Sequence, residues 1–301
     1  MAPFLLAICT LPMWFNSTLV SFLTFLRLRF SKKERRLFHD NIRYIWKLKP
    51  KSHFAEMFVK QVFYSQILIL FETLKIAINP KIVKWEGYED LEREVKAFEK
   101  LGSGQIVVTA HLGSWELVGF AGARAMQHAF YTLAKPAKLP LFTKIMHWSR
   151  RRMQCSVLWS NKKMIQRQMI KAVKDRAWLG FVMDQKPAGR NGPAVQFWGK
   201  KTEFVGGPAK IAIKFQKAII GVFCVRIDTL HYKIISKVIF PAGHGESDPI
   251  KMTQKLAHEI EKMTRMYPEQ WCWNYKRWKF NDIIEETHRQ ASGKGALTPS
   301  S

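Results

Sequence analysis

Short apolar runs alternate with helical periodicities along most of the chain. The runs with the length and composition of strands lie at 82–86, 105–110, 130–134, 178–183, 218–227 and 232–239. Apolar residues at helical spacing predict helices over 29–46, 53–78, 89–101, 117–126, 139–152, 164–176, 207–215 and 249–267. Because strands and helices alternate, the pattern predicts an α/β fold in which helices flank a mostly parallel central sheet.

The N-terminal segment carries no charge from Phe4 to Leu26. A helix of about 20 apolar residues is long enough to span a bilayer. Basic residues follow from Arg27 onward and none precedes the run, which by the positive-inside rule keeps the rest of the chain in the cytoplasm. We expect a membrane anchor over 1–30, a catalytic domain over 31–288 and a disordered tail over 289–301. An interfacial or re-entrant segment and a buried core helix are the alternatives for the N-terminal run.

The net charge of +26 predicts an acidic partner. The excess of basic residues is concentrated at 27–60 and 135–176. Nucleic acid, anionic lipid and an acidic carrier protein all fit such a surface, as does a solvated basic surface without a specific partner. Four scattered cysteines, with no Cys-x-x-Cys pair and no nearby histidine, indicate neither a zinc site nor a disulfide framework. We therefore expect no metal and no cofactor.

Candidate chemistry lies where two predicted strands end. The strand 105–110 is followed by His111-Leu-Gly-Ser-Trp-Glu116, and the strand 178–183 is followed by Asp184-Gln185. Ligand sites in open α/β sheets lie beyond the carboxyl ends of the strands, so both segments are expected at one site. The spacing of His111 and Glu116 is common by chance, and this setting is what makes it informative.

A histidine with a fixed tautomer can take the proton of a hydroxyl near neutral pH. We assign His111 as general base and Glu116 as the carboxylate that orients it. Gly113 is expected to let the backbone approach the reacting carbonyl, and N–H groups at the next helix start to stabilise an oxyanion. No Gly-x-Ser-x-Gly motif is present, and Ser114 is interpreted as part of the scaffold. Direct transfer without a covalent enzyme intermediate follows.

The chain resembles the late acyltransferases of lipid A biosynthesis, the lauroyl/myristoyl transferase family, from its N-terminal apolar segment to about Lys279. The His–four residues–acid motif matches, with Ser114 in place of the usual Asn. The other segments that match the family are Arg150–Arg152, Asp184-Gln185, Gly192–Gly199 with Gly207-Pro208, and Pro268–Arg277. The family usually has His two places after its C-terminal Trp, where this chain has Tyr275.

This resemblance implies a glycerol-phosphate-acyltransferase-like fold and an inner-membrane enzyme of lipopolysaccharide biosynthesis, with its catalytic domain facing the cytoplasm. The implied donor is a thioester on acyl carrier protein, and the implied acceptor is a hydroxyl of a phosphorylated lipid A precursor. The candidates for contact with this substrate are Arg150, Arg152, Asp184, Gln185 and Arg277. The three arginines are chosen because guanidinium groups bind phosphate bidentately. Asp184 is expected to orient an arginine or the acceptor sugar. Which of Arg150, Arg151 and Arg152 is functional stays open.

Other functions remain possible at this stage. The same fold and chemistry fit another glycolipid acceptor, such as a phosphatidylinositol mannoside, or a lysophospholipid, and Tyr275 keeps the acceptor open. A basic nucleic-acid-binding protein fits the charge, but neither a zinc-finger nor an RNP pattern is present. A catalytically inactive scaffold on the same fold is disfavoured because His111 and Glu116 are both in place. We therefore expect an acyltransferase that binds no nucleic acid.

Overall fold

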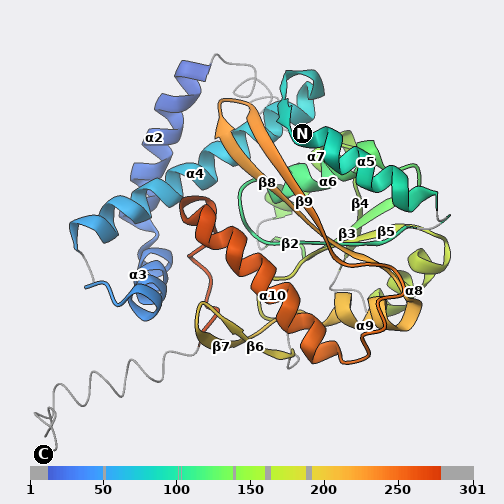
Figure 1. The fold of residues 1–301 in the computed structure, drawn as a ribbon. Helices are drawn as coiled ribbons and strands as arrows, with labels where there is room; N and C mark the ends of the chain where they lie inside the picture. The colour runs from blue at the N-terminus through green and yellow to red at the C-terminus, as the bar shows by residue number, and fades with distance from the viewer. Residues whose placement is uncertain are drawn as a thin grey trace, which may run out of the picture.

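Parallel strands form the centre of the molecule in a computed structural model, which describes residues 13–49, 52–100, 102, 104–137, 140–159, 164–187 and 192–278. Seven strands of these described ranges form one sheet in the order β1-β9-β8-β2-β5-β3-β4. Their bounds are β1 (Lys84–Glu86), β2 (Ile106–Thr109), β3 (Phe130–Ala134), β4 (Ser156–Trp159), β5 (Trp178–Val182), β8 (Ile219–Asp228) and β9 (His231–Phe240). Among the described strands of this sheet, β8 and β9 pair antiparallel and the other neighbours pair parallel (Figure 1). The predicted α/β fold with a mostly parallel sheet is confirmed.

Helices cover both faces of the sheet. Along β2, Val107 packs into one apolar cluster while Ile106 and Val108 pack into another, as the two-residue period of a strand requires. The first cluster is covered by α5 (Tyr88–Glu99) and α6 (Trp115–Ala125). The second cluster is covered by α8 (Ile165–Lys174), α9 (Gly207–Phe215) and α10 (Pro249–Met266). Burial on both faces explains why the central strands are continuous apolar runs.

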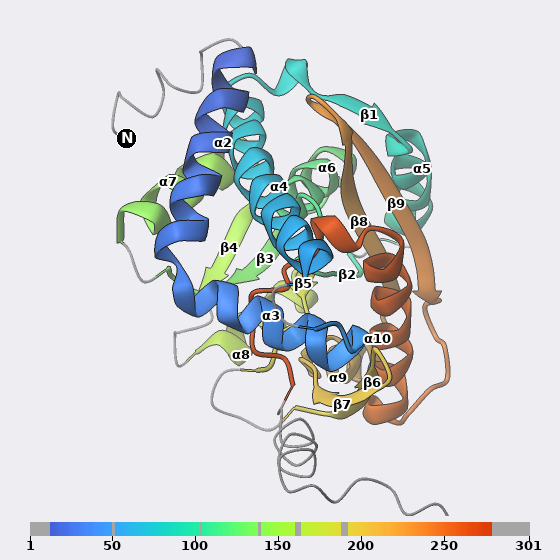
Figure 2. The same cartoon turned by 90° about the vertical axis from the view of Figure 1, so that its left-hand side faces the viewer.

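Three helices, α2 (Met13–Phe30), α3 (Lys32–Trp46) and α4 (His53–Ile78), cover another side of the molecule, which faces the viewer in Figure 2. Helix α4 begins where the Ser52 side chain accepts a hydrogen bond from the backbone N–H of Ala55. Its buried Glu72 accepts two hydrogen bonds from Arg226, at 2.9 Å each, and one from the hydroxyl of Tyr232 at 2.6 Å. These bonds fix α4 to β8 and β9, so the helix is held rigidly beside the sheet.

Predicted and observed elements agree best where apolar residues are buried. The bounds of α4, β3 and α9 are those expected, while α3 begins at Lys32 because α2 continues to Phe30. Strand β4 was not predicted, and neither was the antiparallel hairpin of β6 (Ala194–Phe197) and β7 (Lys200–Glu203). Strand β4 is a partly exposed edge strand whose apolar run is only three residues long, and β7 reads Lys-Lys-Thr-Glu, which contains no apolar residue.

Of the predicted anchor over 1–30, residues 13–30 are described and form α2, while residues 1–12 and the predicted tail over 289–301 lie outside the described residues. Among the described helices, α4 is the one that is long and apolar enough to cross a membrane, and more than half of its apolar window is buried inside the protein. Helices α7 (Pro140–Arg152) and η2 (Pro268–Gln270) complete the elements that surround the site described next.

Candidate active site

His111 and Asp184 meet beyond the carboxyl ends of two paired strands. In the parallel pairing of β2 with β5, Thr109 lies opposite Val182. Two residues further along each strand are His111 and Asp184, and the Nδ1 of His111 lies 2.6 Å from Oδ1 of Asp184. The strand register therefore brings together two residues that are 73 positions apart.

The Asp184 carboxylate is buried and bound by three residues from two segments of the chain. Its Oδ1 also accepts the backbone N–H of His111 at 3.1 Å, and its Oδ2 accepts Nε1–H of Trp271 at 2.9 Å and Nη2–H of Arg277 at 2.8 Å. Burial alone would raise the pKa of Asp184. The charges and hydrogen bonds of His111 and Arg277 outweigh burial and hold this pKa well below its usual range. The carboxylate is thus a fixed negative charge beside the imidazole.

Glu116 does not orient His111, contrary to the assignment made from the sequence. It lies in the first turn of α6 and accepts Nε–H of Arg150 at 2.7 Å and Nη2–H of the same guanidinium at 2.6 Å. It also accepts Nε1–H of Trp115 at 3.1 Å. Burial would lower the pKa of Arg150, but the charge and hydrogen bonds of Glu116 raise it. The two carboxylates therefore have separate partners, and the one that contacts the imidazole is Asp184.

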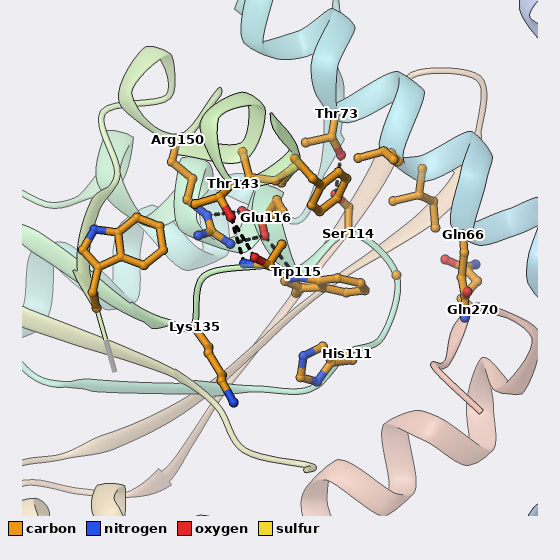
Figure 3. A pocket seen from close by; sticks show the side chains of 17 residues that line it. Gln66, Thr73, His111, Ser114, Trp115, Glu116, Lys135, Thr143, Arg150 and Gln270 are labelled. Carbon is orange, nitrogen blue, oxygen red and sulfur yellow. Dashed lines mark hydrogen bonds and ion pairs between the residues drawn. The ribbon is translucent and has the colours of Figure 1, made fainter. Parts of the chain in front are cut away.

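Two cavities meet at the imidazole. The first, of about 360 Å³, is bounded by α4, α7, the residues after β3 and the Trp159 end of β4. The second, of about 550 Å³, lies over the ends of β3 and β5. The residues that line both cavities are His111, Trp115, Glu116, Lys135 and Arg150. Figure 3 shows them with Gln66 and Thr73 of α4 on one side of the first cavity and Lys135 and Arg150 on the other. The side chain of His111 thus borders two adjoining spaces.

Comparison with known proteins decides the chemistry that this arrangement serves. The family described as bacterial lipid A biosynthesis acyltransferase matches residues 1–280. The chain belongs to this family. A search of curated proteins found no match. The protein is therefore an enzyme, an acyltransferase that acts on lipid A, and its family is typically membrane-associated.

Two of the three arginines predicted to contact substrate of this lipid A acyltransferase, Arg152 and Arg277, do not line the cavities that meet at His111. Arg277 is buried and donates to the side chain and to the backbone carbonyl of Asp184, so its guanidinium is bound by a carboxylate of the protein. Arg152 donates to the carbonyl oxygens of Ala77 and Ile78 at the end of α4. Asp184 accepts a hydrogen bond from Arg277 as part of a buried network that includes His111.

The remaining predicted residues lie beside the cavities of the acyltransferase. Arg150 lines both cavities and Gln185 lines the second. Arg151 is exposed at the end of α7. Tyr275 is half-buried, and its hydroxyl lies 3.5 Å from the carbonyl oxygen of Lys186. Burial raises the pKa of this hydroxyl. Arg150 is thus the arginine of its cluster that is placed to meet a substrate.

The sequence did not reveal the part played by Trp271 or by Thr73. Trp271 was noted within the C-terminal matching segment, but its bond to Asp184 depends on how that segment folds back onto the sheet. The hydroxyl of Thr73 pairs with that of Ser114 at 3.0 Å, which ties α4 to the start of α6. Among the described residues, no group of three or more His, Cys, Asp or Glu is placed to hold a metal ion. Burial raises the pKa of Cys155, beside the second cavity, to about 11, so its side chain is a neutral thiol.

The segment that carries the base is held between strand β8 and the C-terminal segment. Leu112 bridges to Trp271, and Gly113 bridges to Cys224 of β8. Gly113 has φ of +55°, and a Cβ built there would lie 2.1 Å from the carbonyl oxygen of Cys224. Glycine is needed for this close approach to a strand. The backbone N–H of Gly113 donates to the carbonyl oxygen of Gln270, and the expected role of this glycine at the reacting carbonyl stays a prediction.

Gly113→Ala is expected to lower the free energy of unfolding by at least about 2 kcal/mol, through backbone strain and overpacking together. Gly199→Ala is the matched control. Gly199 also has a positive φ, of +69°, but a Cβ there meets nothing within 4 Å. Gly199→Ala is expected to lower the free energy of unfolding by about 1 kcal/mol. Chemical denaturation followed by circular dichroism measures both, and equal losses for the two variants would contradict the close-approach argument.

Proposed function

We propose that this acyltransferase moves a fatty acyl chain from the thioester of acyl carrier protein to a hydroxyl of a lipid A precursor, with His111 as the general base. The observation that carries this mechanism is the 2.6 Å contact between Nδ1 of His111 and the buried Asp184. An imidazole held at Nδ1 by a carboxylate presents Nε2 as its basic nitrogen. This is the tautomer that a general base for a hydroxyl requires.

The proposed reaction has one addition and one elimination. The acceptor oxygen attacks the thioester carbonyl carbon while Nε2 of His111 takes the hydroxyl proton, and Asp184 stabilises the imidazolium that forms. The C–S bond then breaks, and the leaving thiolate takes the proton back from His111. The first backbone N–H groups of a helix have no intrahelical partner, so those of Trp115 and Glu116 in α6 are the candidates to stabilise the oxyanion. No covalent enzyme intermediate is needed.

Arg150 is the proposed contact for a phosphate of the acceptor. Its Nε and Nη2 donate to Glu116, and among the hydrogen bonds of the described residues its Nη1 has none, which leaves that nitrogen for a substrate oxygen. Lys135 lines the same two cavities and adds a second positive charge. Glu116 accordingly acts as the group that fixes the guanidinium rather than as the partner of the base.

The charge of the chain and its family support the proposed partners and compartment. A net charge of +26 complements both an acidic carrier protein and a phosphorylated glycolipid. Exposed Phe22 and Phe25 on α2, followed by the basic residues of α3, suit attachment to an anionic membrane surface. We place the enzyme at the inner membrane, with its catalytic domain facing the cytoplasm.

A transfer assay tests the proposal. Purified protein is mixed with a lipid A precursor and with carrier protein that bears a radiolabelled acyl chain, and labelled lipid is the expected product. The coenzyme A thioester of the same acyl chain is expected to react more slowly. His111→Ala is expected to lower the rate by about 10²–10⁴-fold because proton transfer in the transition state is lost.

His258→Ala is the matched control for this assay, because His258 is exposed on α10 away from the cavities that meet at His111. It is expected to retain the full rate. Full activity in His111→Ala would refute the mechanism. Mass spectrometry of lipids from cells with and without the gene identifies the acceptor. An acyl chain missing from another glycolipid or from a phospholipid, with lipid A intact, would replace the proposed acceptor.

A further inference from the structure

Helix α7 combines exposed apolar and basic side chains in a pattern that the mechanism does not use. Leu141 is 58% exposed and Phe142 is also exposed, both in the first turn. Lys144 and Arg151 are exposed further along the helix. The sequence of α7 contains no acidic residue. Apolar residues beside basic ones, without acidic neighbours on the helix, are typical of helices that lie in the interface of an anionic bilayer.

This helix also forms one wall of the first cavity. Phe142, Thr143 and Met146 line that cavity, which reaches His111. The hydroxyl of Thr143 accepts the backbone N–H of Ala137 at 2.8 Å, so the start of α7 is tied to the segment that follows β3. The exposed first turn of α7 therefore lies at the edge of the space that leads to the base.

We propose that the first turns of α7 are a membrane-contact surface for anionic lipid, separate from the N-terminal helix. This inference rests on the proposed function at a membrane and adds where the active site meets the bilayer. In Figure 2, α2 and α7 both lie toward the left side of the molecule, with α7 behind α2. With α7 on the lipid, the first cavity opens at the bilayer surface, and the acceptor enters it without full transfer into water. The second cavity remains for the carrier-protein thioester.

A fluorescent label tests the contact directly. Leu141→Cys carrying an environment-sensitive nitrobenzoxadiazole group is expected to shift its emission to the blue when vesicles of phosphatidylglycerol are added, and less so with phosphatidylcholine. Ile250→Cys is the matched control, because Ile250 is 56% exposed in the first turn of α10 and neighbours Lys251. The emission of the label at position 250 is expected to stay the same when vesicles are added. Labelled wild-type protein accounts for the other cysteines.

Activity provides the second measurement. Leu141→Ser/Lys144→Gln removes one apolar and one basic contact outside the cavity lining. This variant is expected to match wild-type acyl transfer in detergent micelles and to fall about tenfold when the acceptor is presented in phosphatidylglycerol vesicles. Ile250→Ser/Lys251→Gln is expected to match wild type in both. An equal rate for the α7 variant on vesicles would overturn the inference.

The two proposals fail in different ways. If wild-type protein sediments with phosphatidylglycerol vesicles while the label at position 141 does not respond, the contact by α7 is wrong and the proposed function stands. If wild-type protein neither sediments with vesicles nor acylates an acceptor in them, the membrane location is wrong, and the contact by α7 is wrong with it.

Discussion

Asp184→Asn is expected to lower kcat for acyl transfer by up to about 10⁴-fold while KM changes little. The amide has the shape of the carboxylate but no charge, so it neither holds the required tautomer of His111 nor stabilises the imidazolium. Asp184 lies in the wall behind the imidazole and does not line either cavity that meets there, which is why substrate binding is expected to persist. Steady-state kinetics with acyl-carrier protein measures both constants.

Glu116→Gln provides the comparison for this prediction. Because Glu116 binds Arg150 and not His111, its replacement is expected to act mainly on KM, by loosening the guanidinium that meets the substrate phosphate. The opposite pattern would restore Glu116 as the orienting carboxylate: a loss in kcat for Glu116→Gln with full kcat in Asp184→Asn. Circular dichroism of each variant confirms that the fold is retained.

Arg277→Met is expected to lower the free energy of unfolding at neutral pH by about 3–5 kcal/mol. The substitution removes the guanidinium charge beside Asp184 and leaves that buried carboxylate without one of its cationic partners. The pH dependence distinguishes this cause from lost packing. The folded-state pKa of Asp184 lies below its unfolded value of about 3.9, so the carboxylate stabilises the fold above that pH and loses its contribution as the pH falls. The difference in free energy of unfolding between wild type and Arg277→Met is therefore expected to become smaller below about pH 4.

Denaturant titrations at several pH values measure this difference. Arg265→Met is the control, because Arg265 is half-exposed and pairs with Glu261 near the surface, where an ion pair contributes about 0–1 kcal/mol. The double variant Asp184→Asn/Arg277→Met is expected to lose less than the two single variants together, since each single variant leaves the other partner buried without its counterpart. A loss in Arg277→Met that is the same at acid and neutral pH would show that packing, not charge, is responsible.

The sequence predicted where the base lies but not what holds it. His111 and Asp184 were both expected at strand ends because each follows a run of buried apolar residues. Their contact depends on β2 pairing with β5, and strand order is decided by packing between distant segments. Glu116 was chosen because it is near His111 in the chain. In the structure Glu116 lies in the first turn of α6, and its carboxylate accepts hydrogen bonds from Arg150.

Arg277 shows a second limit of the same kind. A guanidinium binds phosphate and carboxylate equally well by geometry, so its residue type does not reveal which it meets. The C-terminal segment folds back over Asp184, and this arrangement supplies the carboxylate. Strands β4 and β7 were missed for local reasons, because the apolar run of β4 is only three residues long and β7 has no apolar residue.

Synthesis of the chain makes His111 long before some of its structural neighbours. The His111 segment bridges to Trp271, and Asp184 is bonded to Arg277, so both contacts form only after the C-terminal segment has been made. The base is made before half of the chain is complete, yet the groups that fix its carboxylate come from the last part of the described chain. A ribosome-bound chain that ends before residue 277 has a histidine and an aspartate but lacks the charge that holds the aspartate in place. The carboxylate beside His111 therefore has all of its hydrogen bonds only after residues 271–277 have been made and lie over the sheet.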